Sequence, residues 1–415
     1  MRSVTISART GCSDVTVLLP LSKSLSARAI IISMLTDGGV LPLMLSRCDD
    51  TLTLLHGVDV KSGEIDVGAA GTAMRFLTAF HAVSPGHDVL IDGSARMRER
   101  PIGVLVDALR SAGVEIEYLG KEGFPPLHVV GTRVKQVNVT LRGDVSSQYV
   151  SALMMVMPCC GGGVLHLSSP LTSLPYVEMT AALMRHYGAS VNVSADAISV
   201  ADVPYVPRDY RVETDWSAAS YWYGVAALLP GLRVHLPDLS LNDVQGDSDI
   251  RRVMSLLGVT TQELNDEILL EGGKDLECST CPIMCDMAAM PDVAQTVIVT
   301  ACLLGRRFAV SGLSTLRIKE TDRVEALRVE LGKLGYLLHC SYDTITWDGA
   351  RCPRVSSPVI ETYKDHRMAM SMALAGLVSQ GGIEIVDADV VSKSYPDFWN
   401  DLAKVALIGE VSGSE

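Results

Sequence analysis

Short polar or glycine-rich segments recur along the chain, and each is followed by a run of Ala, Met, Leu and Ser that is apolar on nearly every side. Such a run at helical spacing predicts a helix that is buried all round. Alternating polar and apolar positions between the runs predict strands with one solvent-exposed face. The helix starts are expected within residues 24–28, 71–75, 146–150, 216–220, 291–295 and 365–369, and examples of the strands are 137–141, 190–193 and 383–386.

The recurrence predicts an α/β fold in which one unit is repeated at a spacing too long and too irregular for a solenoid. Buried helices and half-wet strands fit a core of helices covered by sheets. If the helices run parallel, their N-termini meet on one surface, which favours anions. Breaks in the pattern predict a discontinuous domain of residues 1–19 plus 215–415 and an inserted domain of residues 20–214.

Charge and composition narrow the class of protein. The 415 residues carry a formal net charge of −13, which argues against a nucleic-acid partner, because nucleic-acid binding needs clustered Lys and Arg. The N-terminal residues show no apolar segment of signal-peptide length, and the most apolar stretch, 150–165, is interrupted by Pro158 and three glycines. We therefore expect a cytoplasmic enzyme with no membrane partner.

The ten cysteines are expected to be reduced thiols that pack as small apolar residues. Cys278, Cys281 and Cys285 follow a C-x2-C-x3-C spacing. No His or fourth Cys nearby completes a zinc set, so no metal site is expected.

The densest charged segment is residues 317–323, which lies between strand-like residues 308–310 and helical residues 324–327. As the first turn of a helix, it places Lys319 and Arg323 on one face with Glu320 beside them. Cations at a helix start oppose the helix dipole unless an anion joins them. The segment alone fits a salt-bridged turn and an anion site equally well.

Eight motifs follow one another along the chain: residues 20–28, 70–75, 96–103, 145–148, 291–292, 317–323, 365–370, and Lys393 before Pro396-Asp397. In this order they resemble the 5-enolpyruvylshikimate-3-phosphate synthase family of enolpyruvyl transferases, over nearly the full length. The resemblance implies two similar globular domains of repeated βαββαβ units with buried parallel helices, an inside-out α/β barrel. It also implies an active site in the cleft between the domains.

The implied reaction transfers the enolpyruvyl group of phosphoenolpyruvate to the 5-hydroxyl of shikimate 3-phosphate and releases phosphate, through a tetrahedral intermediate. This is the 3-phosphoshikimate 1-carboxyvinyltransferase step of the shikimate pathway to aromatic amino acids. The resemblance implies no metal or organic cofactor, and a monomer is expected. Arginine forks suit the carboxylate and phosphate groups of both substrates.

The resemblance also assigns roles to residues. Asp292 is expected to be the base for the hydroxyl and Glu320 to protonate and later deprotonate carbon, with Lys23 a rival for part of this proton transfer. For phosphoenolpyruvate the implied residues are Lys23, Gly71, Arg100, Gln148, Arg323, Arg367 and Lys393. For shikimate 3-phosphate they are Lys23, Ser24, Arg28, Ser146, Ser147, Gln148, Ser173, Tyr176, Asp292, Thr315 and Lys319.

Electrostatics favours a binding role for these cations over a purely structural one. Two like charges about 4 Å apart repel by roughly 4 kcal/mol at an effective dielectric constant near 20. Several cations in one site therefore need anions. Among local acids, only Asp292, Glu320 and Asp49 look available as counter-charges.

The chain departs from the family pattern at several positions. Ala69 replaces a common Asn, Phe76 a common Pro, and Thr315 an Asn that usually contacts shikimate. None of these changes removes a proposed acid, base or phosphate-binding cation. The resemblance implies that Ala69 and Phe76 border the phosphoenolpyruvate pocket, where the herbicide glyphosate competes in this family. Glyphosate is therefore expected to inhibit this chain more weakly than family members that keep Asn and Pro.

Two alternatives remain open. The sister transferase that acts on UDP-N-acetylglucosamine usually carries a reactive Cys near residues 96–101, whereas this chain has no Cys between Cys48 and Cys159. A non-catalytic anion-binding or RNA-end-binding protein on a related fold is the other. The acidic balance and the presence of both Asp292 and Glu320 argue against it.

Overall fold

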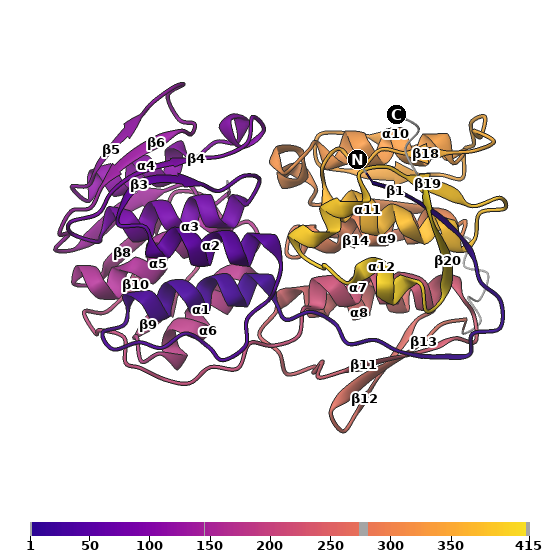
Figure 1. Cartoon of the computed structure of the whole chain (residues 1–415), viewed down its shortest axis with the longest axis horizontal. Coiled ribbons are helices and arrows are strands. Elements are labelled where there is room, and N and C mark those ends of the chain that lie inside the picture. The colour runs from indigo at the N-terminus through magenta and orange to yellow at the C-terminus, as the bar shows by residue number, and fades with distance from the viewer. Residues whose placement is uncertain (1, 145, 274–280, 412–415) are drawn as a thin grey trace. The chain divides into compact units, whose positions relative to one another are not determined.

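The computed structural model describes residues 2–144, 146–273 and 281–411 (Figure 1). It contains two compact units. Unit 1 consists of Met1–Pro20 and Glu213–Glu415, and unit 2 of Leu21–Val212. The division of the chain into two independent domains with boundaries at 19/20 and 214/215 stays a prediction. Each unit has its own large apolar core.

Two four-stranded sheets cover unit 2. The first has the order β3-β4-β6-β5 and the second β7-β8-β10-β9. In each, the first two strands are parallel and the other neighbours antiparallel. The strands are β3 (Ser62–Asp66), β4 (Asp88–Asp92), β5 (Glu115–Tyr118), β6 (Leu127–Val130), β7 (Val137–Leu141), β8 (Gly163–Leu167), β9 (Val191–Val193) and β10 (Ala197–Val200).

Three sheets of the same design belong to unit 1, with orders β14-β15-β17-β16, β12-β13-β11-β2 and β18-β19-β1-β20. Their strands are β1 (Ser3–Ala8), β2 (Asp14–Thr16), β11 (Arg233–Pro237), β12 (Thr260–Leu264), β13 (Glu267–Glu271), β14 (Ile283–Asp286), β15 (Phe308–Ser311), β16 (His339–Cys340), β17 (Ile345–Trp347), β18 (Val359–Ile360), β19 (Ile383–Ile385) and β20 (Ala406–Val411).

All five sheets arise from one repeat, but its order is βαβαββ and not the expected βαββαβ. The physical reason lies in the strand directions. The first two strands are parallel, so a helix must cross over between them, whereas the last two are antiparallel neighbours that a short turn can join. The repeat is interrupted once, because unit 2 is inserted between β2 and the helix that follows it. The N-terminal strand β1 completes the last repeat.

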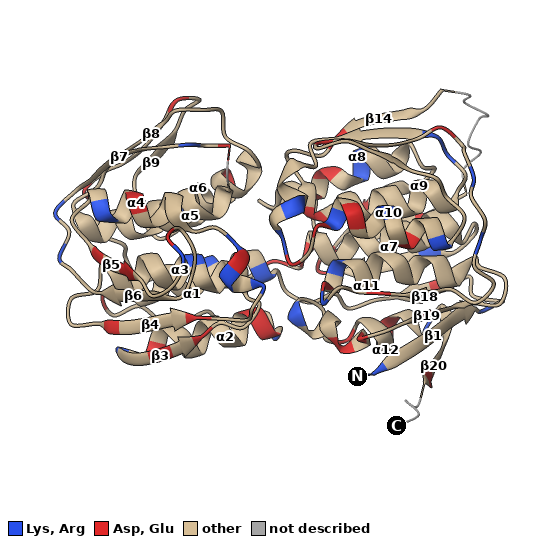
Figure 2. Cartoon of the chain, turned by 90° about the horizontal axis from the view of Figure 1, so that it is seen from above, with Lys and Arg blue, Asp and Glu red and all other residues tan. Residues whose placement is uncertain are grey.

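The first helix of each repeat is buried over nearly its whole length, as predicted. α5, α7 and α9 contain no charged residue (Figure 2). These inner helices are α3 (Gly71–Ala82), α5 (Ser147–Val156), α7 (Trp216–Leu228), α9 (Ala294–Leu303) and α11 (His366–Ala373).

The second helix of each repeat is α4 (Gly103–Ser111), α6 (Leu174–His186), α8 (Ile250–Ser255), α10 (Arg323–Lys333) or α12 (Phe398–Leu402), and α1 (Lys23–Leu35) and α2 (Asp49–Asp59) complete the helices of unit 2. The predicted strands 137–141, 190–193 and 383–386 coincide with or contain β7, β9 and β19. The helix expected within 291–295 begins at Ala294, after a 3-10 turn at Pro291–Val293.

Within the described ranges, no helix combines the length and apolar composition needed to cross a membrane. The nine described cysteines are free thiols, and Cys278 of the C-x2-C-x3-C spacing lies outside the described residues. The described part of the chain also contains no group of three or more His, Cys, Asp or Glu placed to hold a metal ion.

The buried His81, in the last turn of α3, pairs with the half-buried His87. The Nδ1 atoms of His81 and His87 are 2.8 Å apart, and His81 Nε2 lies 3.1 Å from the carbonyl oxygen of Gly57 in α2. Because a carbonyl only accepts, His81 donates from Nε2 and accepts at Nδ1 from His87. Burial, helped by the neighbouring His87, lowers the pKa of His81 to about 4. Burial and Lys61 also lower the pKa of His87.

The histidine pair is expected to make unit 2 sensitive to acid. The unfolded chain binds the His81 proton near its ordinary pKa of 6.5, whereas the folded chain resists it until about pH 4, so stability should rise with pH across this window. His81→Gln, which keeps a donor and an acceptor, should remove roughly 2 kcal/mol of that rise, measured by urea unfolding at pH 4.5 and 6.5. The exposed His56 on α2 provides the control, because His56→Gln should keep the full slope. Equal slopes in both variants would contradict the assignment.

Candidate active site

Seven charged side chains of unit 1 form one connected network. They come from the starts of α9, α10 and α11 and from the end of a 3-10 turn, η7 (Ala388–Lys393). Asp292 lies in the 3-10 turn before α9, and Glu320 lies just before α10. The members are Asp292, Lys319, Glu320, Arg323, Asp365, Arg367 and Lys393.

Arg323 is the centre of this network. Its Nε donates to Asp365 Oδ2 at 2.7 Å, Nη1 to Asp292 Oδ1 at 3.3 Å and Nη2 to Glu320 Oε2 at 3.0 Å. The Arg323 side chain is only 2% exposed. Burial acts to lower the pKa of Arg323, but the charges of the three carboxylates outweigh it and raise that pKa above its ordinary value.

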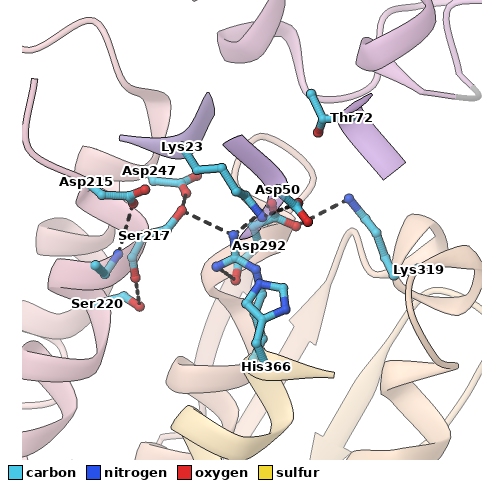
Figure 3. Close-up of polar contacts among 12 residues, drawn as sticks. Lys23, Asp50, Thr72, Asp215, Ser217, Ser220, Asp247, Asp292, Lys319 and His366 are labelled. Atoms are coloured by element: carbon cyan, nitrogen blue, oxygen red, sulfur yellow. Dashed lines mark hydrogen bonds and ion pairs between the residues drawn. The ribbon is translucent and has the colours of Figure 1, made fainter. Parts of the chain in front are cut away.

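Both candidate acids are also held by further cations. Lys319 Nζ lies 3.3 Å from Asp292 Oδ1, an ion pair that Figure 3 draws. Arg367 Nη2 lies 3.1 Å from the other carboxylate oxygen, Asp292 Oδ2. Glu320 Oε1 lies 2.6 Å from Lys393 Nζ. The side chains of Asp292 and Glu320 remain 20% and 11% exposed, so a ligand can reach both acids although Arg323 beneath them is buried.

A second group of implied residues lies in unit 2. Lys23, the first residue of α1, pairs with Asp50 of α2 at 3.0 Å (Figure 3). Gly71 begins α3 where the end of the Arg100 side chain occupies the space that a Cβ would take. A Cβ on Gly71 would lie 2.5 Å from both Nη atoms of Arg100, so the missing side chain lets this guanidinium rest on the helix start.

The implied serines lie at two further helix starts of unit 2. Ser146 caps α5 by accepting from the backbone N–H of Gln148 at 3.3 Å. The Gln148 side chain in turn donates to Thr72 Oγ1 at 3.0 Å, which joins the starts of α5 and α3. Ser147 begins α5, and Ser173 precedes α6 with a positive φ of 57°.

The loops that carry these serines are tied together. The backbone N–H of Gly143 donates to Ser169 Oγ at 3.0 Å, and Thr172 N–H donates to the Gly143 carbonyl at 3.0 Å. The structure therefore groups the loop that leads to Ser146 with the loop that leads to Ser173. Tyr176 follows in the first turn of α6.

Arg28 of α1 differs from Arg323 in its partners. It is 3% exposed and donates to Thr180 Oγ1 at 2.6 Å and to the Ser24 carbonyl at 2.8 Å. Its Nη2 also approaches Ser151 Oγ at 3.3 Å and the Tyr176 carbonyl at 3.4 Å. Among the described residues, Arg28 therefore has hydrogen-bond partners that are all neutral. Burial lowers the pKa of Arg28 to about 10, so the group stays charged at neutral pH.

Comparison with known proteins decides the family. A family model described as EPSP synthase (3-phosphoshikimate 1-carboxyvinyltransferase) matches residues 59–402. The chain belongs to the EPSP synthase family. A relative named 3-phosphoshikimate 1-carboxyvinyltransferase from Bacteroides fragilis is 46% identical over 397 residues, covering 94% of this chain and 95% of the relative. One of the same name from Photorhabdus laumondii is 34% identical, covering 94% and 96%.

The fold of the EPSP synthase family is also found by structural comparison. A solved EPSP synthase from Acinetobacter baumannii matches with a TM-score of 0.76 at 20% identity, covering 99% of this chain and 100% of that one. At this identity the likeness shows the fold alone. The predicted α/β fold class and the family resemblance are thus both confirmed.

Besides the order of the repeat, a second prediction is wrong for this EPSP synthase family member. Lys319 and Arg323 do not share a helix face, because a 3-10 turn ends at Ile318 and α10 begins only at Arg323. Asp322 is the cap of α10 and accepts from Glu325 N–H at 3.1 Å, which sets the helix start there. Lys319 is extended, with φ −81° and ψ −156°, and reaches Asp292 from outside the helix.

The expected set of counter-charges was also incomplete. Asp365 caps α11 by accepting from Arg367 N–H at 2.8 Å and also pairs with Arg323. In unit 2, Asp50 pairs with Lys23, although Asp49 was the acid expected to be available. The position of Asp365 before a buried helix predicts a helix cap. It does not predict the ion pair with Arg323, which is distant in the sequence.

A further pair, Ser217 and Asp247, adjoins Arg367. Arg367 Nη2 lies 3.4 Å from Ser217 Oγ, and Ser217 donates to the buried Asp247 (Figure 3). Asp215 caps α7 by accepting from Ala218 N–H at 3.0 Å. Thr315 lies in the 3-10 turn Ser314–Ile318, and its Oγ1 is buried without a hydrogen-bond partner among the described residues.

The charge of Asp365 should be essential to the stability of the network. Asp365→Asn keeps a cap for α11 but removes one of the three negative charges that pair with the buried Arg323. The free energy of unfolding, measured with urea, should therefore fall by about 2–3 kcal/mol. Asp322→Asn is the matched control, because this cap pairs with Arg317 at a 38% exposed site and should cost less than about 1 kcal/mol. Similar losses in the two variants would refute the central role of the Arg323 pairing.

Proposed function

We propose that the chain transfers the enolpyruvyl group of phosphoenolpyruvate to the 5-hydroxyl of shikimate 3-phosphate and releases phosphate. One observation carries this proposal: in unit 1 the two acids that the reaction needs are held by four cations in a single network. Family membership supports it, since relatives named for this activity match over nearly their whole length. The proposed enzyme is cytoplasmic, as the sequence pattern predicts, and a monomer.

The cations are proposed to bind phosphoenolpyruvate. Its carboxylate and phosphate suit the planar forks of arginine and the point charges of lysine. Gln148 donates from its amide, and Gly71 offers backbone N–H groups at a helix start whose dipole favours an anion. The proposed ligands are Lys23, Gly71, Arg100, Gln148, Arg323, Arg367 and Lys393.

Shikimate 3-phosphate is proposed to bind through hydroxyls and cations. Ser146, Ser147 and Ser173, with Lys319, would hold the phosphate, since hydroxyls and one cation form a suitable phosphate site. Arg28, a buried cation with neutral partners in the described chain, suits the carboxylate of the ring. Thr315 offers its buried hydroxyl. The remaining proposed ligands are Lys23, Ser24, Gln148, Tyr176 and Asp292.

The proposed chemistry uses the two acids in turn. Glu320, in its protonated form, gives a proton to the methylene carbon of phosphoenolpyruvate, which leaves positive charge on the adjacent carbon. Asp292 takes the proton of the 5-hydroxyl as its oxygen attacks that carbon, and a tetrahedral intermediate forms. Glu320 then removes a proton from the new methyl group as phosphate leaves with its bonding electrons. Lys23, an alternative donor for part of this proton transfer, is proposed to assist the departing phosphate.

The proposed reaction is tested by phosphate release when phosphoenolpyruvate is mixed with shikimate 3-phosphate or, separately, with UDP-N-acetylglucosamine. Release is expected only with the former. Glu320→Gln and Asp292→Asn should each lower kcat by roughly 10²–10⁴-fold, because each removes a proton-transfer group. In deuterated water, Glu320→Gln should also stop deuterium entry into the transferred group. Glu325→Gln, at an exposed acid of α10 paired with Arg328, is the control and should leave kcat unchanged. Release with the UDP-sugar alone would transfer the assignment to the sister enzyme.

Gly71 is a second test of the phosphoenolpyruvate site. A Cβ in Gly71→Ala would displace the flexible end of Arg100, so folding should be kept while KM for phosphoenolpyruvate rises about tenfold or more. The control is Gly103→Ala, also at the first residue of a helix in unit 2, where the new Cβ meets its nearest atom at an ordinary 3.4 Å. Steady-state kinetics and thermal melting measure both effects. An unchanged KM in Gly71→Ala would exclude Arg100 at this position from binding.

A further inference from the structure

Phe76 covers one face of the Arg28 guanidinium. The Cζ atom of Arg28 in α1 lies 5.4 Å from the centroid of the Phe76 ring in α3, inside unit 2. Phe76 is completely buried and Arg28 is 3% exposed, so water does not screen the contact. At this distance the negative face of an aromatic ring attracts a cation, and the attraction is largest where both groups are desolvated.

The edge of the same guanidinium is fixed by neutral acceptors. Nε donates once to Thr180, Nη1 once to the Ser24 carbonyl, and Nη2 reaches Ser151 and the Tyr176 carbonyl. Arginine has five N–H groups, so within the described chain one N–H on Nη1 is left to bind another acceptor.

The acceptors of Arg28 are themselves ordered. Ser151 Oγ and Thr180 Oγ1 are 2.8 Å apart, and Thr180 donates to the Tyr176 carbonyl at 2.8 Å. α1, α3, α5 and α6 (Figure 1) therefore all contribute to the position of one buried charge. No carboxylate among the described residues hydrogen-bonds to this charge, so an anion from outside the chain would be its natural counter-charge.

We propose that Phe76 is a positioning residue: its ring holds the Arg28 guanidinium in the orientation in which the remaining Nη1–H meets the carboxylate of shikimate 3-phosphate. The proposal rests on the proposed function, in which Arg28 binds that carboxylate. Phe76 is a position at which this chain departs from the proline of the family pattern. The aromatic contact is therefore a feature of this chain's own sequence.

Electrostatics separates this role from simple packing. A leucine at position 76 would fill much of the same space but would offer no negative ring face to the cation. Without the ring, the buried guanidinium would spend part of its time turned toward other acceptors. Apparent affinity falls in proportion to the fraction of molecules in the binding orientation. The effect should therefore appear as weaker binding of one substrate and leave the chemical step intact.

The test is a series of variants at position 76 in the full-length chain, with KM for each substrate, kcat and the melting temperature as readouts. Phe76→Leu should raise KM for shikimate 3-phosphate about tenfold, while kcat and KM for phosphoenolpyruvate stay within about twofold. Phe76→Tyr, which keeps the ring face, should restore KM. Replacing Phe76 with mono-, di- and trifluorophenylalanine should raise the same KM step by step, because fluorine weakens the negative face with little change of shape.

Phe80 provides the matched control for lost packing. It lies one turn later in α3, is 4% exposed and packs on the rings of His81 and His87. Phe80→Leu should lower the melting temperature without changing either KM. A fluorine series that leaves KM for shikimate 3-phosphate flat, or lowers it, would overturn the positioning role even though the wild type releases phosphate. A wild type that releases none would instead refute the proposed function on which it rests.

Discussion

The burial of Arg323 is the constraint on which the rest of unit 1 depends. A guanidinium that is 2% exposed is tolerable only if carboxylates surround it, and three do so. They come from the starts of three different helices: Asp292 before α9, Glu320 before α10 and Asp365 before α11. One buried charge thereby sets the positions of both acids that the proposed reaction uses.

The topology of the repeat explains why such distant residues meet. In each βαβαββ repeat the first two strands are parallel, so the inner helix begins beyond the carboxyl end of the first strand. Repeats that pack side by side then bring their helix starts to one end of the unit. The link from Gln148 to Thr72 shows this for α5 and α3 of unit 2, and the Arg323 network shows it for unit 1. The apolar inner helices fix the framework, and the charged residues lie where the framework ends.

Local sequence pattern was sufficient for the framework and for most members of the site. All-round apolar runs predicted the buried helices, because a helix without a polar face cannot lie at the surface. The sequence pattern could not predict the extended conformation of Lys319. Residues 317–323 look like one continuous helical turn in the sequence, whereas in the structure α10 begins only after its cap at Asp322. Asp365 and Asp50 were missed for a different reason: each pairs with a cation 42 or 27 residues away, and spacing along the chain does not reveal such a partner.

Arg28 and Arg323, two of the buried arginines, are stabilised in opposite ways. Arg323 is neutralised by three carboxylates of the chain itself, and its charge orients these acids. Arg28 is surrounded by hydroxyls, carbonyls and one aromatic face, none of which cancels a full charge. A cation buried in this way is more costly to the folded chain than one that is paired. The substrate can supply the missing negative charge. This buried cation then lowers the stability of unit 2 but strengthens the binding of an anionic substrate.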